Sequence, residues 1–131
     1  MTDAKPNEQL YNPQTEAALM AAAMFDRDLL LLDVTEDDFH NSELGSLWSL
    51  ACAMQQAGEY VDPITLDDEI QARGLRIDRM LTVRLQALEG VDYAHGGEYA
   101  QRVKEMARRR RTVDIATLIA QAAYRSNGTL D

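Results

Sequence analysis

The stretch GEYAQRVKEMARRRRTVDIATLIAQAAY, residues 97–124, decides the fold of this chain. It contains no proline and, after Gly97, no glycine, so it predicts one uninterrupted helix of about 28 residues. At about 1.5 Å of rise per residue this helix is roughly 40 Å long, which is more than a chain of 131 residues needs for its own core. Part of the helix is therefore expected to project from the body.

The apolar side chains of this helix change sides partway along it. A rotation of about 100° per residue gives the first half one apolar face, made of Tyr99, Val103, Met106, Ala107 and Val113. The second half has another, displaced by roughly 140° around the axis and made of Ile115, Leu118, Ile119 and Ala122. A helix buried against one surface keeps its apolar stripe on one side. We therefore predict that the first face packs on the chain's own body and that the second is a subunit interface.

Four consecutive arginines, Arg108, Arg109, Arg110 and Arg111, lie between the two faces. They point in different directions around the helix, so they cannot all be buried. One interpretation is a solvated turn paired with Glu105 and Asp114. A protein interface is another, because guanidinium groups suit bidentate contacts with carboxylates. Direct DNA contact is a third. The run is a candidate charged contact with all three left open.

Composition describes a single helical domain in the cytoplasm. Of the 131 residues, 46% are apolar and 27% charged, which suffices for one core without disulfides. No apolar run reaches the length of a membrane span, and the polar opening MTDAKPNEQLYNP is no signal peptide. The single cysteine, Cys52, lies in an apolar run and is interpreted as a small buried hydrophobic side chain.

The net charge of −9 is unevenly distributed. Residues 1–70 hold two basic and 15 acidic side chains, whereas residues 71–131 hold 11 basic and seven acidic ones, so the two parts carry −13 and +4. An acidic body repels phosphate backbones and argues against duplex binding by the domain as a whole. Complementary parts favour packing of one copy's arginines on the acidic body of another.

The remaining segments predict an all-α fold, a small orthogonal bundle of about five to six helices. Residues 1–11 form a tail and residues 12–96 a helical body, with Asn12 and Pro13 opening a helix that continues to Val34. Ser42 begins the next helix, and Thr65 caps the one that ends at Gly74. A further amphipathic helix follows in residues 78–89, and no segment alternates like a strand.

No catalytic, metal-binding or cofactor-binding residue is predicted in this chain. The glycines form neither GxxxxGK[ST] nor GxGxxG, and HExxH, CxxC and GxSxG are absent. Acidic clusters at residues 36–38 and 67–69 follow threonines at predicted helix starts. Carboxylates there stabilise the positive end of a helix, so we interpret both clusters as caps.

Five stretches, in the same order along the chain, resemble the N-terminal domain of DnaB-type replicative DNA helicases. The resemblance covers about Asn12 to Tyr124 and is carried by NPQTEAA, AAMFDRDLLLLDV, TEDDFHNSELGSLW, AGEYVDPITLDDEIQARG and GGEYAQRVKEMARRRR, the last including the family's arginine series. The family commonly has a His-Arg pair where this chain has Leu44 and Gly45. That departure puts in doubt any partner contact that depends on the pair.

The resemblance implies a helical globule followed by a helical hairpin. In the family hairpins pair, three pairs form the collar of a hexamer, and primase and a helicase loader are the implied partners. DNA would be contacted only through the hexamer, and ATP and Mg would belong to a motor domain absent here. Residues 97–131 would then be the long helix and the start of the hairpin, with a turn at residues 125–128 and the returning helix lost by truncation. The alternative is a free-standing acidic helical protein that binds or inhibits replication proteins.

Overall fold

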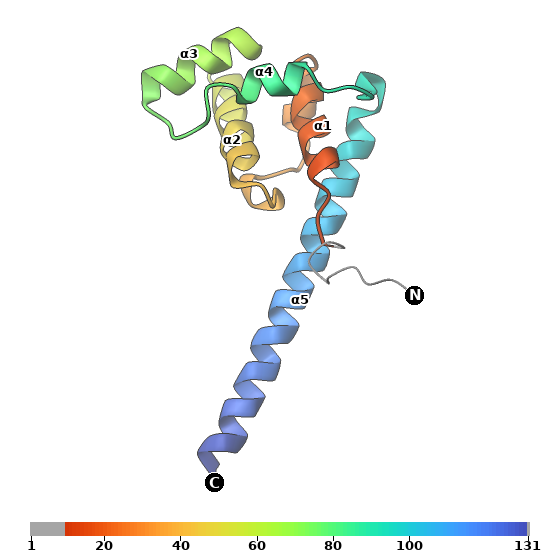
Figure 1. Ribbon diagram of the computed structural model, residues 1–131, viewed down its shortest axis with the longest axis vertical. Helices are drawn as coiled ribbons and strands as arrows, with labels where there is room; N and C mark the ends of the chain where they lie inside the picture. The colour runs from red at the N-terminus through yellow and green to blue at the C-terminus, as the bar shows by residue number, and fades with distance from the viewer. Residues whose placement is uncertain (1–9, 131) are drawn as a thin grey trace.

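The computed structural model describes residues 10–130, and side chains for residues 10–126. Figure 1 shows a compact helical body from which one much longer helix extends. The α-helices are α1 (Pro13–Ala23), α2 (Ser42–Gln56), α3 (Pro63–Arg73), α4 (Leu81–Gln86) and α5 (Gly96–Leu130). Short 3-10 turns are η2 (Arg27–Leu31), η3 (Glu36–Asp38) and η4 (Tyr93–His95). The part of the chain so described contains no strand, which confirms the all-α prediction; most of the predicted tail, residues 1–9, lies outside it.

The beginning of α1 confirms the start predicted at Asn12. The Asn12 side chain accepts hydrogen bonds from the backbone N–H groups of Gln14 and Thr15, at 3.0 and 3.2 Å. Pro13 occupies the first helical position, where its missing N–H costs nothing. The helix nevertheless ends at Ala23 and does not continue to Val34. The Asp26 carboxylate accepts from the N–H of Asp28 and so begins the separate turn η2.

The predicted start of α3 was wrong by three residues. Asp62, not Thr65, is the N-cap, and Pro63 is the first helical residue. Thr65 completes a reciprocal capping box, since its N–H donates to Asp62 at 2.8 Å and its hydroxyl accepts from the Asp62 N–H at 2.9 Å. The restriction that proline places on Asp62 keeps that residue extended, but it does not prevent a helix from starting at Pro63 itself.

The core of the body surrounds α1. Residues Leu19 to Ala23 are fully buried, and α5 packs along this helix more extensively than any other element does. Alanine side chains let helix axes approach closely, which explains how α1 accommodates neighbours on several sides. Trp48 of α2 is buried in the same core and donates from Nε1 to the carbonyl of Val34 at 3.0 Å. Cys52 is half-buried against this core.

Helix α5 has 35 residues and is roughly 50 Å long at 1.5 Å per residue. Its beginning lies against the body, and the rest extends into solvent (Figure 1). Every residue from Arg111 to Ser126 is exposed, and we call this segment the projecting half. The turn expected at residues 125–128 was wrong, because α5 remains helical to Leu130. A single interior glycine costs a helix only about 1 kcal/mol, so Gly128 does not end it.

Candidate functional site

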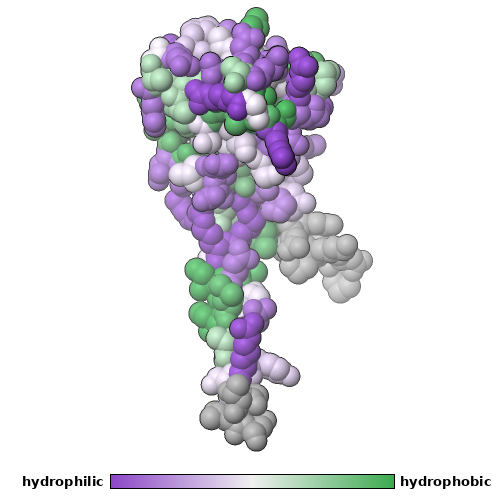
Figure 2. Space-filling model, turned by 90° about the vertical axis from the view of Figure 1, so that its left-hand side faces the viewer, coloured by the Kyte–Doolittle hydropathy of each residue, from purple (hydrophilic) through white to green (hydrophobic). Residues whose placement is uncertain are grey.

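The second apolar face (Ile115, Leu118, Ile119 and Ala122) is exposed along its whole length. Ile115 is 56% exposed, and Leu118 and Ile119 are each 64% exposed. Figure 2 shows a cluster of hydrophobic side chains on the extended helix, below the mostly hydrophilic surface of the body. Contiguous apolar surface of this kind on a helix marks a site of association. The structure therefore brings these four residues together on one accessible surface.

The first apolar face behaves as predicted except at its end. Val103 and Ala107 are buried against the body, with 2% and 1% of their surface exposed, and Tyr99 and Met106 are half-buried. Val113 was predicted to share this face, but it is 43% exposed. It lies at the edge of the body, where it lines a pocket with Tyr11 and Phe39. Helical periodicity cannot show where the neighbouring surface ends.

The four arginines fall into two groups: Arg108 and Arg109 do not contact the body, whereas Arg110 and Arg111 bind it. Arg108 and Arg109 are exposed, and Arg109 pairs with Glu105 at 2.8 Å, as expected for a solvated turn. Arg110 instead donates to the backbone carbonyls of Leu10 and Asp38, at 2.8 and 2.7 Å. Arg111 forms an ion pair with the Asp38 carboxylate at 2.6 Å. Half of the run therefore binds the chain's own body.

Asp38 is the centre of these contacts, which we call the Asp38 clamp (Asp38, Lys104, Arg110 and Arg111). Its side chain is 1% exposed and accepts from the N–H of Thr35 at 2.8 Å. Lys104 lies 3.3 Å from the same carboxylate. Burial alone would raise the pKa of Asp38, but the Thr35 N–H, Arg111 and Lys104 outweigh it and lower the pKa.

The clamp lies where α5 leaves the body. Lys104 and Arg111 are almost two helical turns apart, and both reach the carboxylate of Asp38 from the same side of α5. Every residue from Arg111 to Ser126 is exposed, although Val113 and Asp114 still line a pocket together with Phe39 and His40 of the body. The clamp therefore sets the direction in which the projecting half extends.

The two acidic clusters form caps and surface pairs. Asp38 and Thr35 make the expected capping box at η3. In the second cluster, Asp67 accepts from Gln71 at 3.0 Å and Glu69 pairs with Arg73 at 2.8 Å, each one turn along α3. That cluster stabilises the helix surface and does not cap its end. In the described part of the chain, no three histidine, cysteine or acidic side chains are grouped so that they could hold a metal ion.

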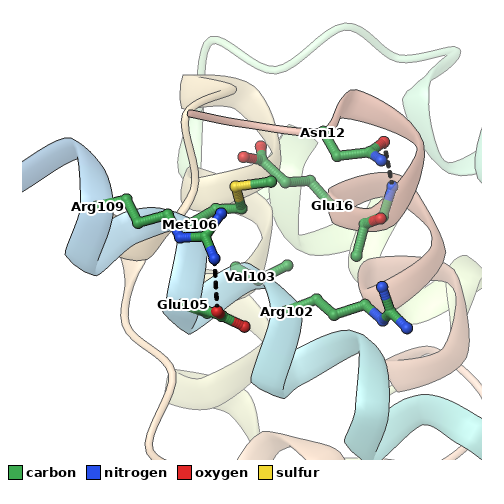
Figure 3. Close-up of a pocket in the computed structure, with 8 residues that line it drawn as sticks. Asn12, Glu16, Arg102, Val103, Glu105, Met106 and Arg109 are labelled. Carbon is green, nitrogen blue, oxygen red and sulfur yellow. Dashed lines mark hydrogen bonds and ion pairs between the residues drawn. The ribbon is translucent and has the colours of Figure 1, made fainter. Parts of the chain in front are cut away.

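Sequence reasoning missed Glu16, a buried carboxylate at the start of α1. It is 2% exposed and accepts from the backbone N–H groups of His40 and Asn41, at 2.9 and 3.0 Å. Figure 3 shows Glu16 beside a cavity of about 180 Å³ between α1 and α5, with Met106 and Arg109 on the α5 side. The Glu16 partners are 24 and 25 residues away, so only the folded chain reveals this role.

Comparison with known proteins identifies the family. The fold is similar to that of the crystal structure of the N-terminal domain of DnaB helicase from Mycobacterium tuberculosis. The TM-score is 0.79 at 23% sequence identity, over 90% of this chain and 88% of that one. The family described as DnaB-like helicase N terminal domain matches residues 8–105. The chain belongs to this family.

The family match ends before the projecting half begins. It stops at residue 105, whereas the second apolar face starts at Ile115. No curated protein sequence matches the chain. Among residues 10–130, no helix is both long and apolar enough to cross a membrane. The prediction of a subunit interface on the projecting half therefore depends on the exposure and composition of that segment.

Proposed function

We propose that this chain is an assembly and docking domain of a cytoplasmic replicative DNA helicase. Two copies associate through the second apolar face, and pairs of this kind build the collar of a hexamer. The body then carries the surfaces on which primase and a helicase loader dock. The observation that supports this proposal most directly is the contiguous exposure of Ile115, Leu118 and Ile119 on a helix that no other part of the described chain covers.

The size of the second apolar face predicts weak pairing. Full burial of an isoleucine or leucine contributes about 1.5–3 kcal/mol, and these side chains are little more than half exposed beforehand. Three of them from each of two copies thus contribute roughly 5–10 kcal/mol, which is comparable with the 4–15 kcal/mol that association costs. Linking several subunits in one ring raises their local concentration and strengthens each pair.

The proposed role includes no chemistry in this chain. ATP and Mg would be bound by the motor domain of the parent helicase, and DNA would be met through the assembled hexamer. Two observations support this division. Asp38 and Glu16, the buried carboxylates, are both engaged in structural hydrogen bonds. Arg110 and Arg111 are bound to the body, which leaves Arg108 and Arg109 as the members of the run that do not contact the body of this strongly acidic domain.

Leu118→Asp tests the pairing directly. A carboxylate on the second apolar face would have to be buried between two helices, so we expect the pair to dissociate while the helical content of each copy is unchanged. Sedimentation equilibrium over a range of protein concentrations measures the change. Thr117→Asp is the matched control, because it introduces the same charge one residue away, on the opposite side of α5. If both variants associate like the wild type, the second apolar face is not the interface.

A further inference from the structure

A groove with a volume of about 520 Å³ lies at the end of the body remote from the projecting half, near the ends of α1 and α4 and the start of α3 (Figure 1). We call it the aromatic groove. Met24 and Val61 line it as buried side chains, each 2% exposed. Phe25, Tyr60 and Ile64 line it as exposed ones, at 60%, 63% and 71%. Large apolar side chains that are exposed around a concave surface are typical of protein interfaces, where they act as anchors.

The aromatic rings of this region are held in place by neighbours. The rings of Phe25 and Tyr93 meet edge to face, with their centroids 5.5 Å apart. The guanidinium of Arg27 lies 5.1 Å from the centroid of the Tyr60 ring. This cation–π contact holds the Tyr60 ring, which is still 63% exposed. Ordered rings reduce the conformational entropy that a partner would have to remove on binding.

The charges around the groove favour a positively charged partner. Asp26, Asp28 and Asp62 line it, against the single cation Arg27. The carboxylates of Asp26 and Asp62 cap η2 and α3, so their positions are fixed by the backbone. The part of the sequence from which most of its lining comes, residues 1–70, holds only two basic side chains against 15 acidic ones. A partner with lysine or arginine beside its apolar side chains is complementary to this surface.

We propose that the aromatic groove docks a basic amphipathic segment of a partner protein. The apolar side chains of that segment would lie against Phe25, Tyr60 and Ile64, and its cations beside Asp28 and the neighbouring carboxylates. This inference rests on the proposed function, since it assigns the docking role to one surface and defines the chemistry of the partner. The groove and the second apolar face lie at opposite ends of the molecule, so docking and pairing do not compete.

The probe is a synthetic helical peptide of about 18 residues, or five turns, with leucines on one face and lysines on the other. A matched peptide carries glutamate in place of every lysine. Binding is measured by fluorescence anisotropy and mapped by amide chemical shifts, with the whole chain and with its Leu118→Asp variant. Peptide binding is thus measured with the second apolar face both intact and disrupted, so a failure of the pairing proposal does not affect the conclusion.

We expect the lysine peptide to bind both proteins and to shift the amides of residues 24–28 and 60–64. Tyr60→Ala removes an exposed anchor, and Asp28→Lys reverses the charge of an exposed side chain. Each should weaken binding by about tenfold. Tyr124→Ala is the control and should leave binding unchanged, because Tyr124 is an exposed tyrosine on the projecting half, far from the groove.

Three results would overturn this inference. The first is equal binding of the glutamate peptide, and the second is binding that Tyr60→Ala and Asp28→Lys leave unchanged. The third is a shift of the groove amides with protein concentration alone, without peptide, which would mean that a second copy of this chain fills the groove.

Discussion

The two halves of α5 share one continuous helix but have opposite environments. In the first half Ala100, Val103 and Ala107 are buried against the body, whereas every residue of the projecting half is exposed. The first half is held by tertiary packing, and the second continues an already nucleated helix at little further cost per residue. Apolar side chains in the first half therefore contribute to folding, and those in the second are available to another molecule.

The largest effect expected from this comparison is that of Val103→Asp. It places a charge in the packed contact between α5 and the body, which should destabilise the fold by about 3 kcal/mol or more. Ile115→Asp puts the same charge on the projecting half and should change the stability of a single copy by less than about 0.5 kcal/mol. Urea unfolding followed by circular dichroism, at dilution where pairs dissociate, compares the two. Equal losses would mean that the projecting half folds back on the body.

The Asp38 clamp holds α5 to η3 where the two halves meet. Asp38→Asn is expected to weaken it. The change removes the charge that Lys104 and Arg111 bind, so we expect a loss of about 2 kcal/mol in the free energy of unfolding. Asp37→Asn, at the exposed neighbouring position, is the control and should cost less than about 0.5 kcal/mol. A loss as small for Asp38→Asn as for Asp37→Asn would show that the ion pairs do not hold α5 to η3.

The clamp also predicts how stability depends on pH. The pKa of Asp38 lies below its ordinary value of 3.8 in the folded chain, so its carboxylate stabilises the fold above that value. This contribution is lost as the pH falls through the ordinary value toward the lower folded one. We expect the wild type to lose more stability than Asp38→Asn between about pH 5 and pH 2, as measured by urea unfolding at each pH.

A second carboxylate, that of Asp78, contributes to the pH dependence of stability in the same range. The backbone N–H of Met80 and the side chain of Arg84 lower the pKa of Asp78 as well. Asp78 is present in both proteins, so the difference between them reports on Asp38 alone. Parallel pH profiles would mean that Asp38 is not ionised in the clamp.

The smallest expected effect on stability comes from replacing single arginines of the run, and it should differ between Arg111 and Arg108. Arg111→Gln removes one partner of Asp38 and should cost about 1 kcal/mol, because the Arg111 side chain is 48% exposed and solvent screens the pair. Arg108→Gln removes an exposed arginine of the same run and should be neutral within about 0.3 kcal/mol. Thermal unfolding at low and high salt measures both. A larger cost for Arg108→Gln would reverse our assignment of the clamp.

Much of the fold could be predicted because local chemistry determines it. Asn12 and Pro13 begin α1 through hydrogen bonds within four residues, and the absence of proline after residue 97 allows α5 to continue. Helical periodicity likewise placed Ile115, Leu118 and Ile119 on one face. The predicted turn at residues 125–128 failed because polar residues and one glycine permit a turn without requiring it.

The site was less predictable, since its decisive contacts are distant in sequence. Arg111 and Asp38 are 73 residues apart, and nothing in RRRR shows that two of the four arginines bind the body. Glu16 has the same character, because its hydrogen-bond donors belong to the segment before α2. The aromatic groove combines the end of α1 with the start of α3.

The sequence by itself determined that the chain is helical and that the apolar face changes along α5, because both depend on residues within a few turns of one another. The uneven charge follows from composition alone. Only the tertiary structure decided where the body ends along α5, and hence that Val113 is exposed and Arg111 is bound. The physical reason is that burial depends on neighbours supplied by distant parts of the chain. Periodicity gives the direction of a side chain, and packing determines what that side chain meets.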